Sequence, residues 1–258
     1  MLSIIIFIFG AIIGSFLNML IYRLPLELSL IEPNRSVCPN CNNNIKWYEN
    51  IPILSYIFLK GKCSSCNIKI SLFYPIVEII TAIITFLIYL KYGLNYDFFI
   101  FSLLFYILIV LSFIDFRYKA VPDYLLILSL IVVAFTTNFH FDIALMFAGG
   151  FVLLELFLTY YIQNIKSKIT KDDSLKEQRA MGEGDIPIIA IIGGVLGIKL
   201  ALIAIFLSAI FAMLPALFNI YIKKDIETPF IPYLTLALFV VLIYGDFLTS
   251  ILNGVVNI

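Results

Sequence analysis

Long, almost uninterrupted apolar runs are the feature that most constrains this chain. Of its 258 residues, 62% are hydrophobic and 13% are charged, and the mean hydropathy is +1.05. Ordinary globular domains contain roughly 25% charged residues. Because backbone polar groups within hydrocarbon must be satisfied inside the same segment, apolar runs of this length predict helices. We therefore expect an all-α, polytopic integral membrane protein.

About eight stretches are long and apolar enough to span a bilayer. The first lacks the basic start and small-residue cleavage site of a secretory signal, so we expect it to remain as a span. All but Lys91 and Lys199 of the 17 Lys and Arg residues fall in alternate loops, which the positive-inside rule places in the cytoplasm. Both termini then lie outside. The predicted spans are residues 2–22, 72–90, 98–114, 122–138, 143–165, 186–198, 200–222 and 230–252.

Charge and histidine content argue against several functional classes. The formal net charge is zero, so the sequence shows no basic surface for nucleic acid. The single histidine, His140, gives little support to Ser-His-Asp catalysis, Cys-His catalysis or a His-rich metal site. We interpret it as an interfacial residue, which leaves the acids and cysteines as the groups that can carry chemistry.

All four cysteines lie in one predicted cytoplasmic loop, residues 23–71, as the pairs C-P-N-C and C-S-S-C. Disulfides are not expected in a reducing compartment. Four thiolates suit tetrahedral zinc, and a loop too small for its own core would draw its folding energy from the metal. A redox pair or four incidental thiols are the alternatives. The expected structural zinc ligands are Cys38, Cys41, Cys63 and Cys66.

Seven acidic residues lie inside the predicted spans or at their ends, where charge is costly. Asp115 ends the third span and Asp185 begins the sixth, which places both at the cytoplasmic face. Two close carboxylates share a proton, so one can activate water while the other acts as the acid toward a scissile carbonyl. A helix cap and an interfacial charge are the alternatives for this pair. The other five acids are Glu78, Asp123, Glu155, Glu183 and Asp246.

The residues around Asp185, in M-G-E-G-D-I-P, support a catalytic role. Gly182 and Gly184 leave no side chain beside the carboxylate, so a substrate backbone can approach closely. Pro187 suits the first turn of a helix. By contrast, Glu183 lies beside a turn in water, and we interpret it as a surface charge.

The remaining acids lie at different predicted depths in the membrane. Glu78 lies about two turns into the second span and Glu155 near the middle of the fifth, so both need partners. For each, a structural contact and a contact with substrate or cofactor remain open. We interpret Asp123 and Asp246 as charges near the membrane surfaces.

Several motifs occur in an order that resembles a known family. The chain carries, in order, G-S-F-L-N-M-L-I-Y-R-L-P, C-P-N-C, W-Y-E-N-I-P-I-L-S-Y, G-K-C-S-S-C, I-S-L-F-Y-P-I-V-E, I-D-F-R-Y-K-A-V-P-D and G-E-G-D. Together they resemble the type IV prepilin peptidases, which are bifunctional leader peptidase/N-methyltransferases and GxGD aspartic proteases.

The resemblance implies a multi-pass enzyme of the bacterial inner (cytoplasmic) membrane. Such an enzyme cleaves the basic leader of type IV prepilins or type II secretion pseudopilins at the cytoplasmic face. It then N-methylates the new N-terminal residue with S-adenosylmethionine. The resemblance implies Asp115 and Asp185 as the catalytic aspartates. The corresponding regions are a first helix at residues 1–22, a zinc loop at 23–71 linked to methyl transfer, and a peptidase domain at 72–258.

The sequence contains fewer signals for a methyltransferase site than for a peptidase site. No G-x-G-x-x-G stretch follows a strand, so a Rossmann-type cofactor site is not supported. We therefore expect S-adenosylmethionine to bind among loops and helix ends between the zinc loop and the second span, near Glu78.

Two other functions remain alternatives. One is a GxGD protease that cleaves other membrane helices, which the tetracysteine loop argues against. The other is a transporter or scaffold whose membrane acids carry protons and whose zinc loop docks a partner.

Overall fold

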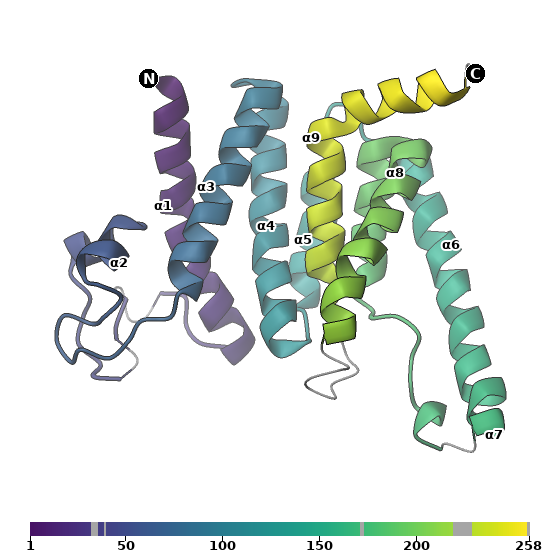
Figure 1. The fold of residues 1–258 in the computed structure, drawn as a ribbon, viewed down its shortest axis with the longest axis horizontal. Coiled ribbons are helices and arrows are strands. Elements are labelled where there is room, and N and C mark those ends of the chain that lie inside the picture. The colour runs from purple at the N-terminus through teal and green to yellow at the C-terminus, as the bar shows by residue number, and fades with distance from the viewer. Residues whose placement is uncertain (32–35, 39, 171–172, 219–228, 257–258) are drawn as a thin grey trace. The chain divides into compact units, whose positions relative to one another are not determined.

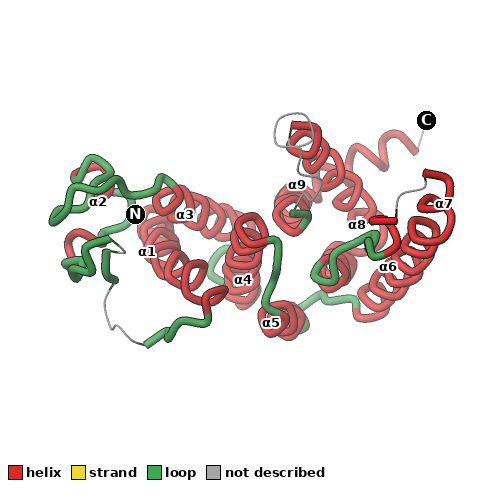
Figure 2. The backbone as a smooth tube through the Cα atoms, turned by 90° about the horizontal axis from the view of Figure 1, so that it is seen from below, coloured by secondary structure: helices red, strands yellow, loops and turns green. Residues whose placement is uncertain are grey.

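The computed structural model describes residues 1–31, 36–38, 40–170, 173–218 and 229–256. Helices joined by turns and loops make up these residues, and none of them lies in a named strand (Figure 2). The all-α prediction is confirmed. The end of the predicted seventh span, residues 219–222, lies outside the described residues.

The chain forms two compact units, Met1–Pro122 and Asp123–Ile258. In the first unit the helices α1, α3 and α4 pack together, while α2 belongs to the long loop between α1 and α3 (Figure 1). Its elements are α1 (Leu2–Arg23), the 3-10 helices η1 (Leu24–Leu26) and η2 (Trp47–Asn50), α2 (Leu54–Phe58), α3 (Phe73–Tyr92) and α4 (Tyr96–Tyr118).

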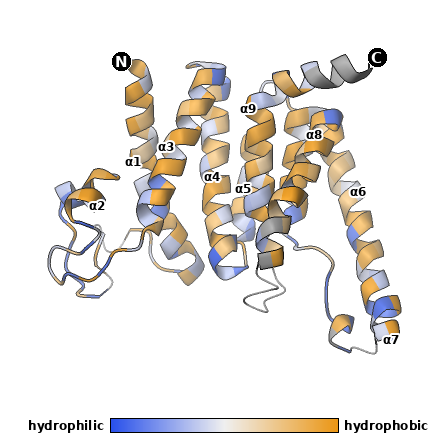
Figure 3. Ribbon diagram, viewed as in Figure 1, coloured by the Kyte–Doolittle hydropathy of each residue, from blue (hydrophilic) through white to orange (hydrophobic). Residues whose placement is uncertain are grey.

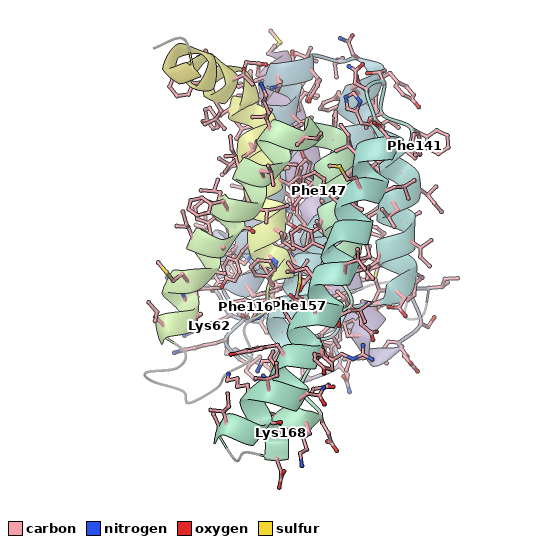
Figure 4. The ribbon with its side chains drawn as sticks, turned by 90° about the vertical axis from the view of Figure 1, so that its right-hand side faces the viewer. Lys62, Phe116, Phe141, Phe147, Phe157 and Lys168 are labelled. Carbon is pink, nitrogen blue, oxygen red and sulfur yellow. The ribbon has the colours of Figure 1, made fainter. Side chains whose placement is uncertain are left out.

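The second unit is built around α8, which packs against α5, α6 and α9. Figure 4 shows Phe141 and Lys168 at opposite ends of the long rod that α6, a π-helical segment and α7 form together. Its elements are α5 (Asp123–Val133), α6 (Phe141–Tyr160), the π-helix η3 (Tyr161–Lys166), α7 (Ser167–Thr170), η4 (Asp173–Lys176), α8 (Asp185–Phe218) and α9 (Ile231–Val256).

The predicted number of eight spans is not confirmed. Among the described residues, six helices are long and apolar enough to cross a membrane. The expected fourth span corresponds to α5, whose 11 residues extend only about 17 Å. The expected sixth span and residues 200–218 of the expected seventh both fall within α8, which is interrupted at Gly197, beside the predicted boundary between them.

A break at Gly197 divides α8 into two helical arms. Gly197 has φ 70° and ψ 173°, dihedrals that are essentially restricted to glycine. The first arm begins at Asp185 and ends beside the start of α6, where the backbone N–H of His140 donates to the carbonyl of Gly194 at 2.9 Å. The turn is therefore fixed against α6.

Two glycines one turn apart bring α1 and α3 into close contact. A Cβ added at Gly10 would lie 2.8 Å from the Cα of Ala82, and one added at Gly14 would lie 2.7 Å from the Cα of Glu78. The pattern is G-x-x-x-G, in which small residues allow two membrane helices to approach. This contact brings Glu78 against α1.

Polar residues gather at the ends of the helices in both units, while the helix middles are apolar (Figure 3). Many apolar side chains along α1 and α6 are exposed, including Ile12 on α1 and Phe157 on α6. In water such exposure would be costly. On a helix that spans a bilayer it is the expected surface toward lipid.

We expect Gly14→Ala to lower the stability of the first unit. The new methyl would overlap the α3 backbone, and overpacking of this kind typically costs about 1–3 kcal/mol. The matched control is Gly149→Ala on α6, because a Cβ there meets nothing within 4 Å. Thermal unfolding of the detergent-solubilised protein measures both. An unchanged midpoint for Gly14→Ala would show that α1 and α3 are not held this closely.

Candidate functional site

The four cysteines form a compact cluster. Their sulfur atoms all lie within 4.8 Å of one another, and the Sγ atoms of Cys38 and Cys66 are 3.8 Å apart. Zn–S bonds of about 2.3 Å in a tetrahedron require sulfur separations of about 3.8 Å. The donor set and its spacing therefore fit zinc, which Cys38, Cys41, Cys63 and Cys66 would hold.

The two cysteine pairs are built in the same way, 25 residues apart in the sequence. In the first, Cys38 N–H donates to the Asn43 carbonyl at 3.0 Å and Asn42 N–H donates to the Cys38 carbonyl at 2.8 Å. The second repeats both bonds, from Cys63 to Ile68 at 2.9 Å and from Asn67 to Cys63 at 3.0 Å.

The same repeat extends to the backbone geometry around each pair. Asn42 and Asn67 both have positive φ, 54° and 58°, a conformation that asparagine tolerates better than most residues. The bridges Val37 to Asn44 and Lys62 to Lys69 flank the two turns. Each pair thus forms a knuckle that offers two thiols in one direction.

Backbone N–H groups in the knuckles favour thiolates. The N–H groups of Cys41 and Asn40 lower the pKa of Cys38 to about 6, and that of Ile68 lowers the pKa of Cys66. The Asn43 N–H lowers the pKa of Cys41, but burial and the neighbouring thiols outweigh it and raise this pKa to about 11. A bound divalent cation would favour the Cys41 thiolate as well, because metal binding requires all four cysteines to be deprotonated.

Glu78 joins α3 to the loop that carries the cysteines. The side chain is buried, and its Oε2 accepts a hydrogen bond from the backbone N–H of Ile53 at 2.7 Å. A second hydrogen bond comes from Ser15 of α1. Glu78 therefore has the partners that a carboxylate at this depth requires.

The backbone at Ile53 is strained. Its φ of 63° and ψ of −52° place it at the centre of a γ-turn, in which Leu54 N–H donates to the Pro52 carbonyl at 2.6 Å. A β-branched residue rarely adopts these dihedrals, which cost of order 1–3 kcal/mol. The hydrogen bond to Glu78 contributes to holding this turn.

A cavity of about 920 Å³ lies between α1 and the loop. Ligand pockets typically measure about 300–1,000 Å³ and are mainly apolar with a few polar groups. The wall on the loop side includes Trp47 and residues 50–54, and the wall on the helix side includes Ile12, Ser15 and Arg23. Because Ser15 and Ile53 line this cavity and also bond Glu78, the carboxylate lies directly behind its wall.

Asp115 lies in the last full turn of α4 and is buried, with 7% of its surface exposed. Its carbonyl accepts the N–H of Lys119, whose φ of 52° ends the helix. The C-terminal end of a helix does not stabilise a negative charge. A buried carboxyl group there points to a role other than capping.

Asp185 is the first residue of α8 and is equally buried, at 7% exposed. Its Oδ2 accepts the N–H of Gly182 at 3.3 Å, and its own N–H donates to the Gly182 carbonyl at 3.1 Å. A Cβ at position 182 would lie 3.3 Å from that carboxylate oxygen. The expected clearance beside Asp185 is therefore present at Gly182.

The other acids lie in more ordinary surroundings. Glu183 is exposed and forms an ion pair with Arg179. Asp123 is exposed at the start of α5, Asp246 is exposed on α9, and Glu155 is half-buried on α6. The two aspartates of the predicted dyad belong to different units, Asp115 to the first and Asp185 to the second.

Sequence reasoning missed two features of the site. One is the strained turn at Ile53, because Asn50 and Pro52 indicate a turn but do not indicate a positive φ at a β-branched residue. The other is the contact at Gly10 and Gly14, which the G-x-x-x-G spacing within an apolar run signals directly.

Comparisons with known families cover most of the chain. Residues 8–92 match the bacterial peptidase A24 N-terminal domain, and residues 102–217 match the type IV leader peptidase family. The prepilin leader peptidase/N-methyltransferase of Vibrio cholerae is 37% identical over 217 residues, which are 80% of this chain and 82% of the relative. The chain belongs to the type IV leader peptidase family. The resemblance predicted from the motifs is thereby confirmed.

Other members of the type IV leader peptidase family align over nearly their full length. The prepilin leader peptidase/N-methyltransferase of Bacillus subtilis is 33% identical and covers 97% of each chain. That of Aeromonas hydrophila is 30% identical over 95% of this chain and 91% of the relative. No solved structure matches the chain. With its apolar helices, the chain is a multi-pass bacterial inner membrane protein.

We expect the purified protein to contain about one zinc ion per chain, because the cysteine set supplies a single tetrahedral site. Cys63→Ser should lose the metal and make residues 36–70 sensitive to protease, since the knuckles depend on it. Elemental analysis and limited proteolysis measure the two effects. Ser65→Ala, in the same knuckle, is the control. Metal-free wild-type protein with a protease-resistant loop would contradict the assignment.

Proposed function

We propose that this protein cleaves the leader peptide of type IV prepilins or pseudopilins and then N-methylates the new N-terminal residue. The observation that carries the peptidase assignment is the burial of Asp115 and Asp185, each at the end of an apolar helix. Burying a carboxylate is costly in a membrane protein. A shared catalytic site explains why both are present.

The proposed cleavage uses the two aspartates as a general acid and base. One carboxylate removes a proton from a water molecule, whose oxygen adds to the scissile carbonyl carbon. The other carboxyl group donates a proton to the carbonyl oxygen. The carbon–nitrogen bond then breaks, the amine takes up a proton, and the dyad returns to its singly protonated state.

The position of the aspartates suits a substrate of this class. A prepilin carries a basic leader followed by an apolar helix, so its scissile bond lies near the cytoplasmic face of the membrane. The positive-inside pattern places the ends of the helices that carry Asp115 and Asp185 on that side. We therefore propose that the active site faces the cytoplasm and that the peptidase domain comprises residues 72–258.

The methyltransferase activity is proposed for the first helix and the zinc loop, residues 1–22 and 23–71. S-adenosylmethionine, when bound, supplies the methyl group. The zinc cluster has a structural role in the proposal, because four protein ligands leave no open position for a reacting group. The cofactor site is proposed beside Glu78, whose carboxylate meets α1 and residue Ile53 of the loop.

Replacing either aspartate by asparagine should abolish cleavage. Because Asp115→Asn or Asp185→Asn removes one member of the acid–base pair, we expect the rate to fall by about 10²–10⁴-fold. The assay follows processing of a prepilin by the purified protein in lipid. Asp246→Asn, an exposed carboxylate on α9, is the control. Full processing by either dyad variant would refute the proposed roles.

Glu78→Gln should separate the two activities. Glutamine keeps an oxygen that accepts the Ile53 N–H, so the loop stays in place, but the negative charge is lost. We expect methyl transfer to a precleaved peptide to fall by about 10²-fold or more, with prepilin cleavage retained. Mass spectrometry of the product measures both. Exposed Glu27→Gln is the control, and unchanged methylation in Glu78→Gln would exclude the charge from the reaction.

A further inference from the structure

The cavity beside α1 is elongated along that helix. Its wall includes Ile8, Ile12, Phe16 and Met19, which recur at helical spacing and so form one stripe. The first three are about half exposed, at 52%, 53% and 53%. We call the space between this stripe and the loop residues Trp47 and 50–54 the α1 groove. A stripe of this length matches a partner that lies along the helix.

The lining of the α1 groove is apolar at one end and more polar at the other. Its lining is apolar around Ile8 and Ile12, whereas Ser15 and Arg23 line it toward the end of α1 that the charge pattern places in the cytoplasm. A ligand that fills it therefore needs an apolar body in the membrane and a polar end near the cytoplasm. The N-terminal segment of a cleaved pilin has this form and this orientation.

Hydrogen-bond acceptors gather behind the polar end of the groove. Glu78 carries a carboxylate there, and Ser15 joins it. Asn18, one turn further along α1, donates from Nδ2 to the Tyr74 carbonyl at 3.0 Å, while its buried Oδ1 has no hydrogen-bond partner among the residues that the structure describes. A primary ammonium group carries three donors. A carboxylate directly behind the wall of the groove is complementary to such a group.

The strained turn separates these acceptors from the groove. Ile53 lines the groove and also donates its N–H to Glu78. An incoming ammonium group can replace the Ile53 N–H as a hydrogen-bond donor to the Glu78 carboxylate. Ile53 is then released from its γ-turn, so the strain stored there favours the exchange.

We infer that the α1 groove binds the apolar N-terminal segment of the cleaved substrate and presents its new α-amino group to Glu78. This inference rests on the proposed methyl transfer and names the site of the methyl acceptor. A lipid acyl chain would fill the apolar half but would leave Glu78 without a cationic partner. S-adenosylmethionine is polar throughout and would leave the membrane half of the groove unfilled.

Photocrosslinking tests the inference without relying on methylation. The photoreactive residue p-benzoylphenylalanine replaces Phe16, which lines the groove, or Phe9, which is similarly exposed at 48% but does not line it. The probe is a synthetic mature pilin peptide with a free N-terminal Phe, in bilayer nanodiscs. We expect Phe16 to capture the peptide several-fold more than Phe9, and N-acetylation of the peptide or Glu78→Gln to reduce that capture.

The outcomes separate this inference from the proposed function. Equal capture at both positions would indicate only lipid-like contact and would overturn the inference. Loss of capture on addition of S-adenosylhomocysteine would assign the groove to the cofactor and would also overturn it. Selective capture by a wild-type background that never methylates the peptide would support the docking site and refute the proposed methyl transfer.

A kinetic measurement gives a second readout. Ile12→Trp fills the groove from an exposed position, and Phe9→Trp adds similar bulk outside it. We expect Ile12→Trp to raise the KM for the peptide by about tenfold, with the KM for S-adenosylmethionine unchanged. A rise in the cofactor KM alone would overturn the inference.

Discussion

The contact between α1 and α3 at Gly10 and Gly14 is the interaction on which the first unit depends. Without side chains at these positions the two backbones approach closely enough for Glu78 to reach Ser15. The same carboxylate then holds Ile53 and with it the loop. A packing feature of two membrane helices thus determines where a polar, cysteine-rich segment meets the membrane.

The two knuckles give a short polar loop a fixed shape. Each knuckle satisfies its own backbone and aims its N–H groups at sulfur, and Asn40 of the first reaches Cys66 of the second at 3.7 Å. Neither contains a hydrophobic core. A shared cation is therefore the natural link between them, and the loop's order is tied to metal rather than to burial.

The apolar runs were sufficient to predict an all-helical membrane protein, and C-x-x-C spacing was sufficient to predict the cysteine cluster. Span number was harder, because hydropathy does not distinguish a short helix such as α5 from a full span. The boundary predicted after residue 198 does lie beside the break at Gly197. Burial of Asp115 and Asp185 followed from their place in apolar sequence. The hydrogen-bond partner of Glu78 could not be predicted from the sequence, because Ile53 contributes a backbone N–H and no side-chain chemistry.

The hydrogen bond that anchors the turn of α8 determines how far along α6 Asp185 lies. At 1.5 Å per residue, Asp185 lies about 14 Å along its arm from Gly194, which is held at the start of α6. Thr159, which bonds the N–H of Ala180, lies about 27 Å along α6 from the same end. The chain therefore turns inward between Ala180 and Asp185. For the proposed hydrolysis, water must therefore reach this buried carboxylate along a polar path.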